Sequence, residues 1–527
     1  MRVLLSVLLA ILACDQIANG YRILGVFPLN GKSHWVMMEQ LMKGLASRGH
    51  QVDVITHFPL KKPIPNYTEI SLAGSLPQVM NNLTADDVRR FDSSSKYMLT
   101  YLAGTKICEL LNHPKLKDLV ENPPQDPPYD IVIVELFAAP CYLAFGRHLG
   151  VPMVGTVTSA LHSWLDNLSG NPPSLAFVPN LFSTFTQQMS FKERLINVLM
   201  FFGVNTQINH YTNSQTHYVK ESFGLDVRHI TELHRDISLY LVNSHHSLNG
   251  IRPMTPSVVE IGGLHLRDDG HLEPEVQKWL DESEHGCVYF TFGSMVRIES
   301  FSKKLMQQMY RSFEKIAPVR VLMKIAKKED LPPGLPKNVM TQSWFPQMSV
   351  LKHKNTRAFI THGGLMGTQE AIACGVPMIG IPLFADQRIN INNYVNKKVA
   401  ISLKSIDDVT EEKLTSALNT ILKDPSYREN IQQLSKLFLD RPMSALNTSI
   451  YWVEYVAKYG NVLQSPALQL YWWQWNLLDI FAFIFAVIAT VLYIALYILR
   501  KLKNYLLFGS RACANKSGAA LKSKKNK

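Results

Sequence analysis

Apolar and polar residues alternate along the first part of the chain as in a parallel α/β domain. Residues 21–27 form an apolar run that predicts a strand, and residues 34–48 carry apolar side chains at helical spacing. Gly49 ends this helix, and residues 52–56 predict the next strand. Residues 130–135 (DIVIVE) are rich in β-branched residues, which predicts a strand buried on both faces. This order of elements is typical of a doubly wound sheet.

Longer polar or mixed segments separate these strands. Residues 59–76 are rich in proline and predict a loop, whereas residues 84–120 predict mainly helix. Residues 182–223 are helical in pattern and rich in aromatic residues and methionine, which fits either core packing or a contact surface. A strand over 239–242 closes this half. Residues 243–269, with their prolines and glycines, predict an interdomain linker.

The second half repeats the alternation of strands and helices. Six apolar runs predict its strands: 287–292, 319–325, 339–342, 357–361, 378–381 and 400–403. Thr410 is placed to cap a helix over 411–423. We therefore expect an α/β protein with two Rossmann-like domains that face a cleft, over residues 21–242 and 270–460.

The two ends of the chain differ from this pattern. Residues 1–20 have a charged start, an apolar run and small residues at their end, as in a secretory signal peptide. Residues 480–499 are uncharged and long enough to span a bilayer as a helix, after an aromatic-rich juxtamembrane segment over 461–479. Residues 500–527 carry nine basic and no acidic residues, which predicts a cytosolic tail. We therefore expect a single-pass type I membrane protein with a lumenal body.

The net charge of +12 does not indicate a nucleic-acid partner, because most of it lies in the tail and leaves the body close to neutral. Lys524 and Lys525 resemble the dilysine retrieval signal of endoplasmic-reticulum membrane proteins, so we expect the protein in that membrane. A solvated tail that contacts anionic lipid is the alternative.

Cysteines and glycosylation sequons fit a lumenal body. Four cysteines lie between the two ends, without metal-binding spacing: Cys108, Cys141, Cys287 and Cys374. They are most simply buried thiols, although one disulfide stays open. N-x-S/T sequons begin at Asn66, Asn82, Asn167 and Asn447.

A glycine turn in the second half carries the candidate chemistry. The strand over 357–361 ends at His362, and Gly363 and Gly364 lead into a helix over 365–374. Ligands bind beyond the carboxyl ends of strands in open α/β sheets, and a helix N-terminus suits a phosphate. On its own, however, a glycine pair here is more often only a tight turn.

The wider segment, residues 344–387, resembles the signature of the UDP-glycosyltransferases. It contains WFPQ at 344–347, the turn at His362, and Asp386 followed by Gln387. That family has the two-domain GT-B fold and moves a sugar from a UDP-sugar to a small acceptor. The resemblance implies nucleotide-sugar contacts by Gly293, Ser294, Trp344, Gln347, His362, Gly363, Gly364, Gly367, Thr368, Glu370, Asp386 and Gln387.

By the same resemblance, these residues divide the ligand among them. Trp344 would stack on uracil with Gln347 beside the nucleoside, Glu370 would bind the ribose hydroxyls, Asp386 and Gln387 the sugar, and His362 with the Gly293–Ser294 turn the diphosphate. Two positions depart from the family. Met366 stands where relatives often have a polar residue, and Ala385 stands where vertebrate relatives commonly have glycine.

The candidate base lies in the other half. His34 opens the first helix within GKSHW, which resembles the family's catalytic GSHW histidine. The positive helix end disfavours the imidazolium form, so a neutral base stays available. Glu135, at the end of the buried strand, is placed to hold the other ring nitrogen, as the carboxylate does in a Ser-His-Asp triad. The family usually has Asp at this place.

No Asp-x-Asp pair occurs in the sequence, so we expect no metal; donors and a helix end would stabilise the diphosphate instead. The resemblance, nearest to the insect branch, implies an inverting transfer of glucose to a hydroxyl of a small lipophilic acceptor, as in detoxification or hormone or pigment conjugation, with no cofactor besides the UDP-sugar co-substrate. Two alternatives are a catalytically weak nucleotide-binding regulatory partner and a membrane lipid or sterol glycosyltransferase. Homo- and hetero-oligomers stay open.

Overall fold

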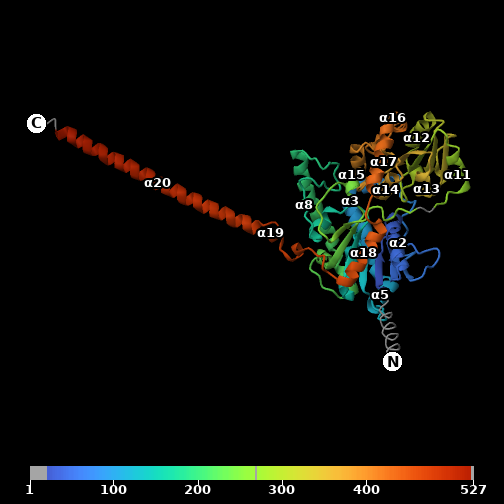
Figure 1. The fold of residues 1–527 in the computed structure, drawn as a ribbon, viewed down its shortest axis with the longest axis horizontal. Helices are drawn as coiled ribbons and strands as arrows, with labels where there is room; N and C mark the ends of the chain where they lie inside the picture. Colours follow the sequence, from blue (N-terminus) through green and yellow to red (C-terminus); the bar gives the residue numbers. More distant parts are fainter. Residues whose placement is uncertain (1–19, 268–269, 524–527) are drawn as a thin grey trace, which may run out of the picture. The chain divides into compact units, whose positions relative to one another are not determined.

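The computed structural model describes residues 20–267 and 270–523. It separates into a large unit, Met1–Ser465, and a small unit, Pro466–Lys527. The large unit contains two parallel sheets with helices packed around them, and the small unit is mostly one helix (Figure 1). The two sheets are the Rossmann-like domains that the alternating pattern predicts.

Within residues 20–267, seven parallel strands form the first sheet, in the order β3-β2-β1-β4-β5-β6-β7. Their bounds are β1 Arg22–Phe27, β2 Gln51–Thr56, β3 Tyr67–Ser71, β4 Ile131–Glu135, β5 Met153–Val157, β6 Ile237–Val242 and β7 Val258–Glu260. All residues of β4 are buried, as its β-branched run predicts. Because β1 pairs in parallel with β4, their carboxyl ends lie at the same edge of the sheet.

Helices connect these strands. Their bounds are α2 Lys32–Ser47, α3 Ala85–Thr100, α4 Lys106–Cys108, α5 Pro114–Glu121, α6 Ala144–Leu149, α7 Ser163–Leu168, α8 Phe191–Asn213, α9 Thr216–Phe223 and α10 His246–Asn249. Short 3-10 turns also occur, among them η3 Pro140–Leu143. The helical expectation for residues 84–120 is confirmed, because α3, α4 and α5 cover most of that range with short π and 3-10 turns between them.

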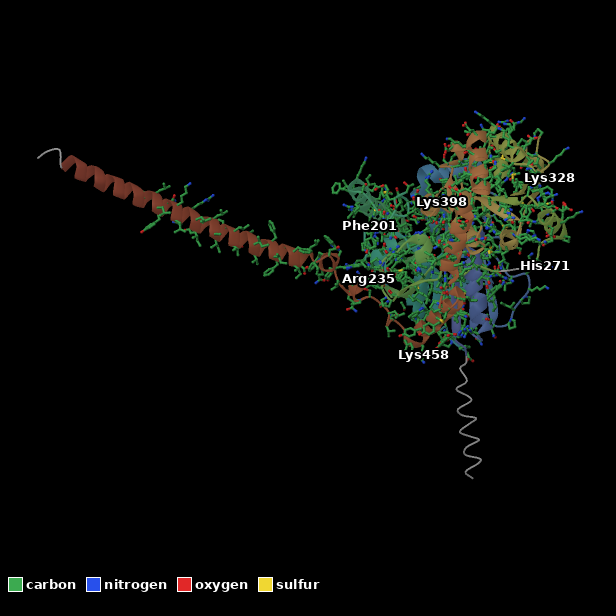
Figure 2. All side chains as sticks on the ribbon, turned by 45° about the horizontal axis from the view of Figure 1, so that its top comes forward. Phe201, Arg235, His271, Lys328, Lys398 and Lys458 are labelled. Carbon is green, nitrogen blue, oxygen red and sulfur yellow. A yellow bond between two sulfur atoms is a disulfide. The ribbon has the colours of Figure 1, made fainter. Side chains whose placement is uncertain are left out.

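Helix α8 has an apolar face that is not buried. Phe191, Leu195, Leu199 and Phe202 are all more than half exposed, and their spacing places them along one side of the helix. Phe201, labelled in Figure 2, is buried instead. One face of α8 therefore packs on the core and the other presents apolar side chains outward, and the contact surface stays a prediction.

Within residues 270–523, six parallel strands form the second sheet, in the order β10-β9-β8-β11-β12-β13. Their bounds are β8 Cys287–Thr291, β9 Arg320–Lys324, β10 Val339–Gln342, β11 Thr356–Thr361, β12 Met378–Gly380 and β13 Ala400–Ser402. The helices of this half are α11 Pro274–Asp281, α12 Lys303–Lys315, α13 Gln347–Lys352, α14 Leu365–Ala373, α15 Gln387–Asn396, α16 Glu411–Lys423, α17 Pro425–Leu439 and α18 Ala445–Tyr459. Each of the six expected strands is present.

The last helix of the large unit, α18, packs on the first domain. The bounds expected for the second domain, 270–460, therefore extend too far toward the C-terminus. Ile450, on α18, is buried in the same apolar cluster as residues of β1 and α2. Gly44 of α2 lets the two helices approach closely, because a Cβ there would lie 2.7 Å from Leu446. His50 and Glu454 form an ion pair at 3.1 Å. Figure 1 shows α18 beside α2. An amphipathic pattern predicts a helix but not the domain that it covers.

Three further expectations need correction. The loop expected over 59–76 contains β3, an edge strand whose residues are only partly buried and therefore lack an apolar run. The linker expected over 243–269 contains β7, which is three residues long and is held by pairing with β6. The helix expected over 182–223 begins only at Phe191, because Ser190 caps it and starts the helical turn there.

Two of the four body cysteines form a disulfide, so the interpretation of all four as thiols is wrong for this pair. Cys108 at the end of α4 is bonded to Cys141 in η3. Cys287 and Cys374 are free. The two partners are 33 residues apart, and only the fold brings them together.

The small unit consists mainly of α19 (Trp472–Trp475) and α20 (Leu478–Ser523). Among the described residues, one helix is long and apolar enough to cross a membrane, over Leu478–Phe508, and none of that stretch is buried. The span expected at 480–499 lies inside it. The expected signal peptide and the lysines near the C-terminal end fall outside the described residues, apart from Gly20.

Candidate active site

His34 lies in the first turn of α2, just beyond the carboxyl end of β1. Its Nδ1 is 2.5 Å from Oε1 of Glu135, the last residue of β4. The side chain of Glu135 is buried, and that of His34 is partly exposed. With Nδ1–H donated to the carboxylate, Nε2 is the basic nitrogen. The expected pair is therefore formed, and the glutamate reaches the ring despite its extra methylene.

Thr158 is a third member of this group that the sequence reasoning missed. Its Oγ1 is 2.9 Å from His34 Nδ1 and 3.4 Å from Glu135 Oε1. The hydroxyl can donate to the carboxylate while the imidazole N–H points between the two oxygens. Thr158 directly follows β5, which pairs with β4, so the three groups come from neighbouring strand ends.

Aromatic rings enclose the other side of His34. The ring of Phe137 meets it edge to face, with 4.7 Å between centroids. Behind Phe137, His162 stacks on Trp164. Burial, together with the nearby charge of His34, lowers the pKa of His162 to about 3, so this ring stays neutral. His34 is thus the one of these two histidines that is open to solvent and suited to take up a proton.

In the second domain, the ring of His362 lies between two glycines. A Cβ on Gly293 would lie 2.8 Å from its Cε1, and a Cβ on Gly364 would lie 2.7 Å from its Nε2. Gly363 has φ +88°, and a Cβ there would meet Ile391 at 2.5 Å. The glycines are therefore required by the position of the histidine as well as by the turn.

Two polar atoms at this turn lack partners. Nδ1 of His362 and Oγ of Ser294 are buried, and neither has a hydrogen-bond partner among the residues that the structure describes. Burial, and next the charge of Lys324, lowers the pKa of His362 to about 4, so the ring is neutral at pH 7. Because buried polar groups are usually paired, we expect a bound ligand to supply the partners that these two atoms lack. Helix α14 begins three residues after His362, and its first N–H groups have no partner within the helix.

Lys324, the last residue of β9, is a second residue that the sequence reasoning missed. Its Nζ donates to the Gly293 carbonyl at 2.8 Å and also contacts Oδ1 of Asn81. It lies 5.4 Å from the centre of the Trp344 ring. Burial lowers the pKa of this ammonium group to about 8. A cation therefore lies between the tryptophan and the His362 turn.

The nucleoside-side residues are also brought together. Trp344 is half exposed, so one face of its ring is available for stacking. The amide of Gln347 donates to the carboxylate of Glu370. Burial raises the pKa of Glu370 to about 7. Gly367 allows this arrangement, because a Cβ there would lie 3.2 Å from Nε2 of Gln347.

Asp386 precedes α15 and accepts a hydrogen bond from Asn390 at 2.9 Å. Burial raises the pKa of Asp386, while its bond to Asn390 and the nearby His34 act in the opposite direction. Asn392 of the same helix donates to the carbonyl of Thr184 in the first domain at 2.6 Å, so the two halves meet beside Asp386. The Gln387 side chain is used locally, since its Oε1 accepts the N–H groups of Leu383 and Phe384 at 2.7 and 3.0 Å.

A cavity of about 460 Å³ lies beside α15, and His34, Glu135 and Asp386 are not among the residues that line it. It is lined from the first domain by the segments around α7 and the loop before α8, and from the second by α15. Asn390, which binds Asp386, is part of its wall. Apolar side chains such as Leu161 and Phe201 alternate there with polar ones such as Asn180. A small organic molecule would fit this space.

A family model described as "UDP-glucoronosyl and UDP-glucosyl transferase" matches residues 23–512. The chain belongs to the UDP-glycosyltransferase family. UDP-glucosyltransferase 2 of Dactylopius coccus is 34% identical over 97% of this chain and 98% of that protein. UDP-glucuronosyltransferase 1A9 of Mus musculus is 29% identical over 99% of this chain and 98% of that protein.

Solved structures agree on the fold of this UDP-glycosyltransferase. The crystal structure of Medicago truncatula UGT71G1 complexed with UDP-glucose superposes with a TM-score of 0.57 and 18% identity, covering 84% of this chain and all of that one. The glycotransferase of kitacinnamycin superposes with a TM-score of 0.54 and 17% identity, covering 83% of this chain and 99% of that one. The two parallel-sheet domains therefore form a GT-B fold.

One expected contact is not brought to the site of this UDP-glycosyltransferase. Thr368 is fully buried, with its Oγ1 donating to the carbonyl of Leu365 and lying 3.1 Å from the hydroxyl of Tyr394. Helix α14 turns its side chain into the core, one turn beyond Leu365. Met366 packs against the core of the first domain, and its carbonyl accepts a bond from His265. Its side chain thus has a packing role at a position where relatives often have a polar residue.

Proposed function

We propose that this UDP-glycosyltransferase transfers glucose from UDP-glucose to a hydroxyl of a small lipophilic acceptor, with inversion at the anomeric carbon. One observation carries the proposal: the paired His34 and Glu135 of one domain lie near Asp386 of the other, and Asn390 links Asp386 to the Gly363 carbonyl beside His362. A base and a leaving-group site on opposite sides suit a single in-line displacement.

In this reaction, Nε2 of His34 takes the proton of the acceptor hydroxyl as the oxygen attacks the anomeric carbon. The bond from that carbon to the phosphate oxygen breaks on the opposite face, and its electron pair leaves with UDP. Glu135 stabilises the imidazolium that forms, and Thr158 keeps the carboxylate in place. One displacement inverts the configuration.

The leaving diphosphate gains its hydrogen bonds from groups that have no other partner. His362 Nδ1–H, the Ser294 hydroxyl and the N-terminus of α14 can all donate to it. These donors support a reaction without a metal ion, as does the absence of an Asp-x-Asp pair from the sequence. Activity should therefore persist after treatment with a chelator.

The acceptor class is supported by two surfaces. The cavity of about 460 Å³ between α15 and the first domain has room for a small organic molecule. The exposed apolar face of α8 suits contact with a bilayer, from which lipophilic acceptors partition. A membrane lipid or sterol acceptor would also reach the protein from the bilayer beside α8. Glucose as the sugar is supported by the relative named UDP-glucosyltransferase.

The location that we propose is the endoplasmic-reticulum membrane, with the large unit in the lumen. The apolar helix over Leu478–Phe508 provides the anchor. The Cys108–Cys141 disulfide suits an oxidising compartment. All four sequon asparagines are exposed, so each is accessible for glycosylation: Asn66, Asn82, Asn167 and Asn447.

A donor and acceptor screen on the full chain in detergent or microsomes tests the proposal. UDP-glucose, UDP-glucuronic acid and other UDP-sugars are each offered with phenolic, steroid and lipid acceptors, and products are detected by mass spectrometry. A glucosylated small molecule supports the proposal. UDP binding without turnover of any pair would instead indicate a regulatory nucleotide-binding member, and a product restricted to lipids would indicate the membrane glycosyltransferase.

A further inference from the structure

Lys324 carries a charge that its surroundings do not neutralise. The residue is only 6% exposed. Its two hydrogen-bond acceptors, Oδ1 of Asn81 and the carbonyl of Gly293, are both neutral. Among the described residues, no carboxylate lies within ion-pair distance of Nζ, and buried charges are normally paired.

The acid that acts on this lysine is already engaged. Glu299 influences Lys324 only from a distance. Its carboxylate accepts the N–H groups of Ala326 and Lys327, and Arg297 lies 3.4 Å from it. Glu299 therefore cannot also neutralise the ammonium group. An ammonium group has three donors, and the two neutral acceptors leave one for a further partner.

The direction of that partner follows from the neighbours of Nζ. The lysine binds the carbonyl of Gly293, whose own Cα packs against the ring of His362. Its charge also helps to lower the pKa of His362. The unpartnered hydroxyl of Ser294 is on the next residue. All of these are the groups that the proposed function assigns to the diphosphate, and Trp344 lies on the other side.

We propose that Lys324 is a diphosphate-binding residue that supplies the positive charge opposite the leaving UDP. The inference rests on the proposed UDP-sugar site and adds a charged residue to it. A cation at this place offsets the charge that the phosphate oxygens gain as the glycosidic bond breaks, a task for which neutral donors alone are weaker.

Calorimetric binding of UDP and of uridine to the full chain in detergent tests this inference. Lys324→Met should weaken UDP binding at least about tenfold and leave uridine binding within about twofold, because uridine has no phosphate. Lys324→Arg retains the charge and should recover most of the UDP affinity. Lys327→Met removes an exposed lysine from the same segment and should change neither affinity.

Each other outcome contradicts the inference in a recognisable way. Equal losses of UDP and uridine affinity would mean that Lys324 only supports Trp344 or the fold. A thermal unfolding curve of Lys324→Gln would then distinguish a local effect on Trp344 from a loss of overall stability. Unchanged UDP binding by Lys324→Met would place the phosphates elsewhere. If the unaltered chain bound uridine and UDP equally or not at all, the proposed function itself would fail as well.

Discussion

The two halves of the active site differ in how completely their polar groups are paired. In the first domain, His34, Glu135 and Thr158 bond one another with short distances. In the second domain, His362 Nδ1 and Ser294 Oγ are buried without partners among the described residues, and Lys324 has no acid beside it. The base is therefore organised before any ligand binds, whereas the leaving-group site is completed by its ligand.

This difference fits the two tasks. A general base must be in the right tautomer when the acceptor arrives, so its carboxylate partner is part of the protein. A diphosphate brings its own negative charge and acceptor oxygens, so a site made for it presents donors and no acceptors. If the comparison is correct, changes in the first half impair turnover without weakening UDP binding, and changes in the second half weaken binding.

The largest effect is expected for His34→Ala. Removal of the base should lower kcat by about 10³-fold, within the range that a positioned general base contributes. UDP affinity, measured by calorimetry, should stay within about twofold of the unaltered chain. His217→Ala, at an exposed histidine on α9, is the matched control and should leave both quantities unchanged. Full activity of His34→Ala would assign the base to another residue.

A smaller loss is expected for Glu135→Gln. The amide can still accept the Nδ1–H bond, but it no longer carries the charge that stabilises the imidazolium, so kcat should fall by about 10²-fold. Steady-state kinetics measure this loss. Glu39→Gln, on α2 and paired with Lys43, is the control. A Glu135→Gln variant as active as the control would reduce Glu135 to a packing role.

In the second half, uridine binding should depend on pH. The pKa of Glu370 is raised to about 7 by burial, so this carboxyl is mostly neutral below that pH and charged above it. Only the carboxylate accepts two ribose hydroxyl protons, so affinity should rise several-fold from about pH 6 to about pH 8. Uridine has no phosphate group that could titrate in this range. Burial keeps the pKa of His265 near 4, so His265 does not contribute to the pH dependence either. Glu370→Gln should bind uridine weakly at every pH; a slope that persists in this variant would rule out Glu370 as its cause.

The smallest effect is expected for Ala385→Gly, beside Asp386. Ala385 has φ +56°, in the left-handed region that favours glycine. The substitution should raise the free energy of unfolding by about 0.5–1 kcal/mol. Relief of the backbone strain stabilises the fold, and the greater chain entropy of glycine in the unfolded state offsets part of that gain. Chemical denaturation measures it. A loss of stability would show that the alanine methyl group makes a contact worth more than the strain.

Much of the two-domain fold and the contact between His34 and Glu135 could be predicted, because both depend on local pattern. Strand ends that neighbour one another in a parallel sheet bring their following residues together, and this rule placed His34 beside Glu135. Applied to β5 and β9, the same rule would also have suggested Thr158 and Lys324, which lie at the ends of those strands. Neither stands out by type, because a threonine and a lysine are common in loops.

Other features depend on tertiary contacts and could not be predicted. The Cys108–Cys141 pair and the return of α18 to α2 join segments that no local pattern links. The error at Thr368 was avoidable. Leu365, Thr368 and Ile372 follow helical spacing and share the buried face of α14, so the helix period alone turns Thr368 inward.

The anomeric configuration of the product tests the central claim most directly. The full chain is supplied with UDP-α-glucose and an accepted hydroxyl compound, and the proton coupling at the anomeric carbon is measured by NMR before any mutarotation of hydrolysed sugar. A base on one side of the cleft and a leaving-group site on the other predict a β-glucoside as the only initial product. An α-glucoside would contradict the single displacement and the roles given to His34 and the His362 turn.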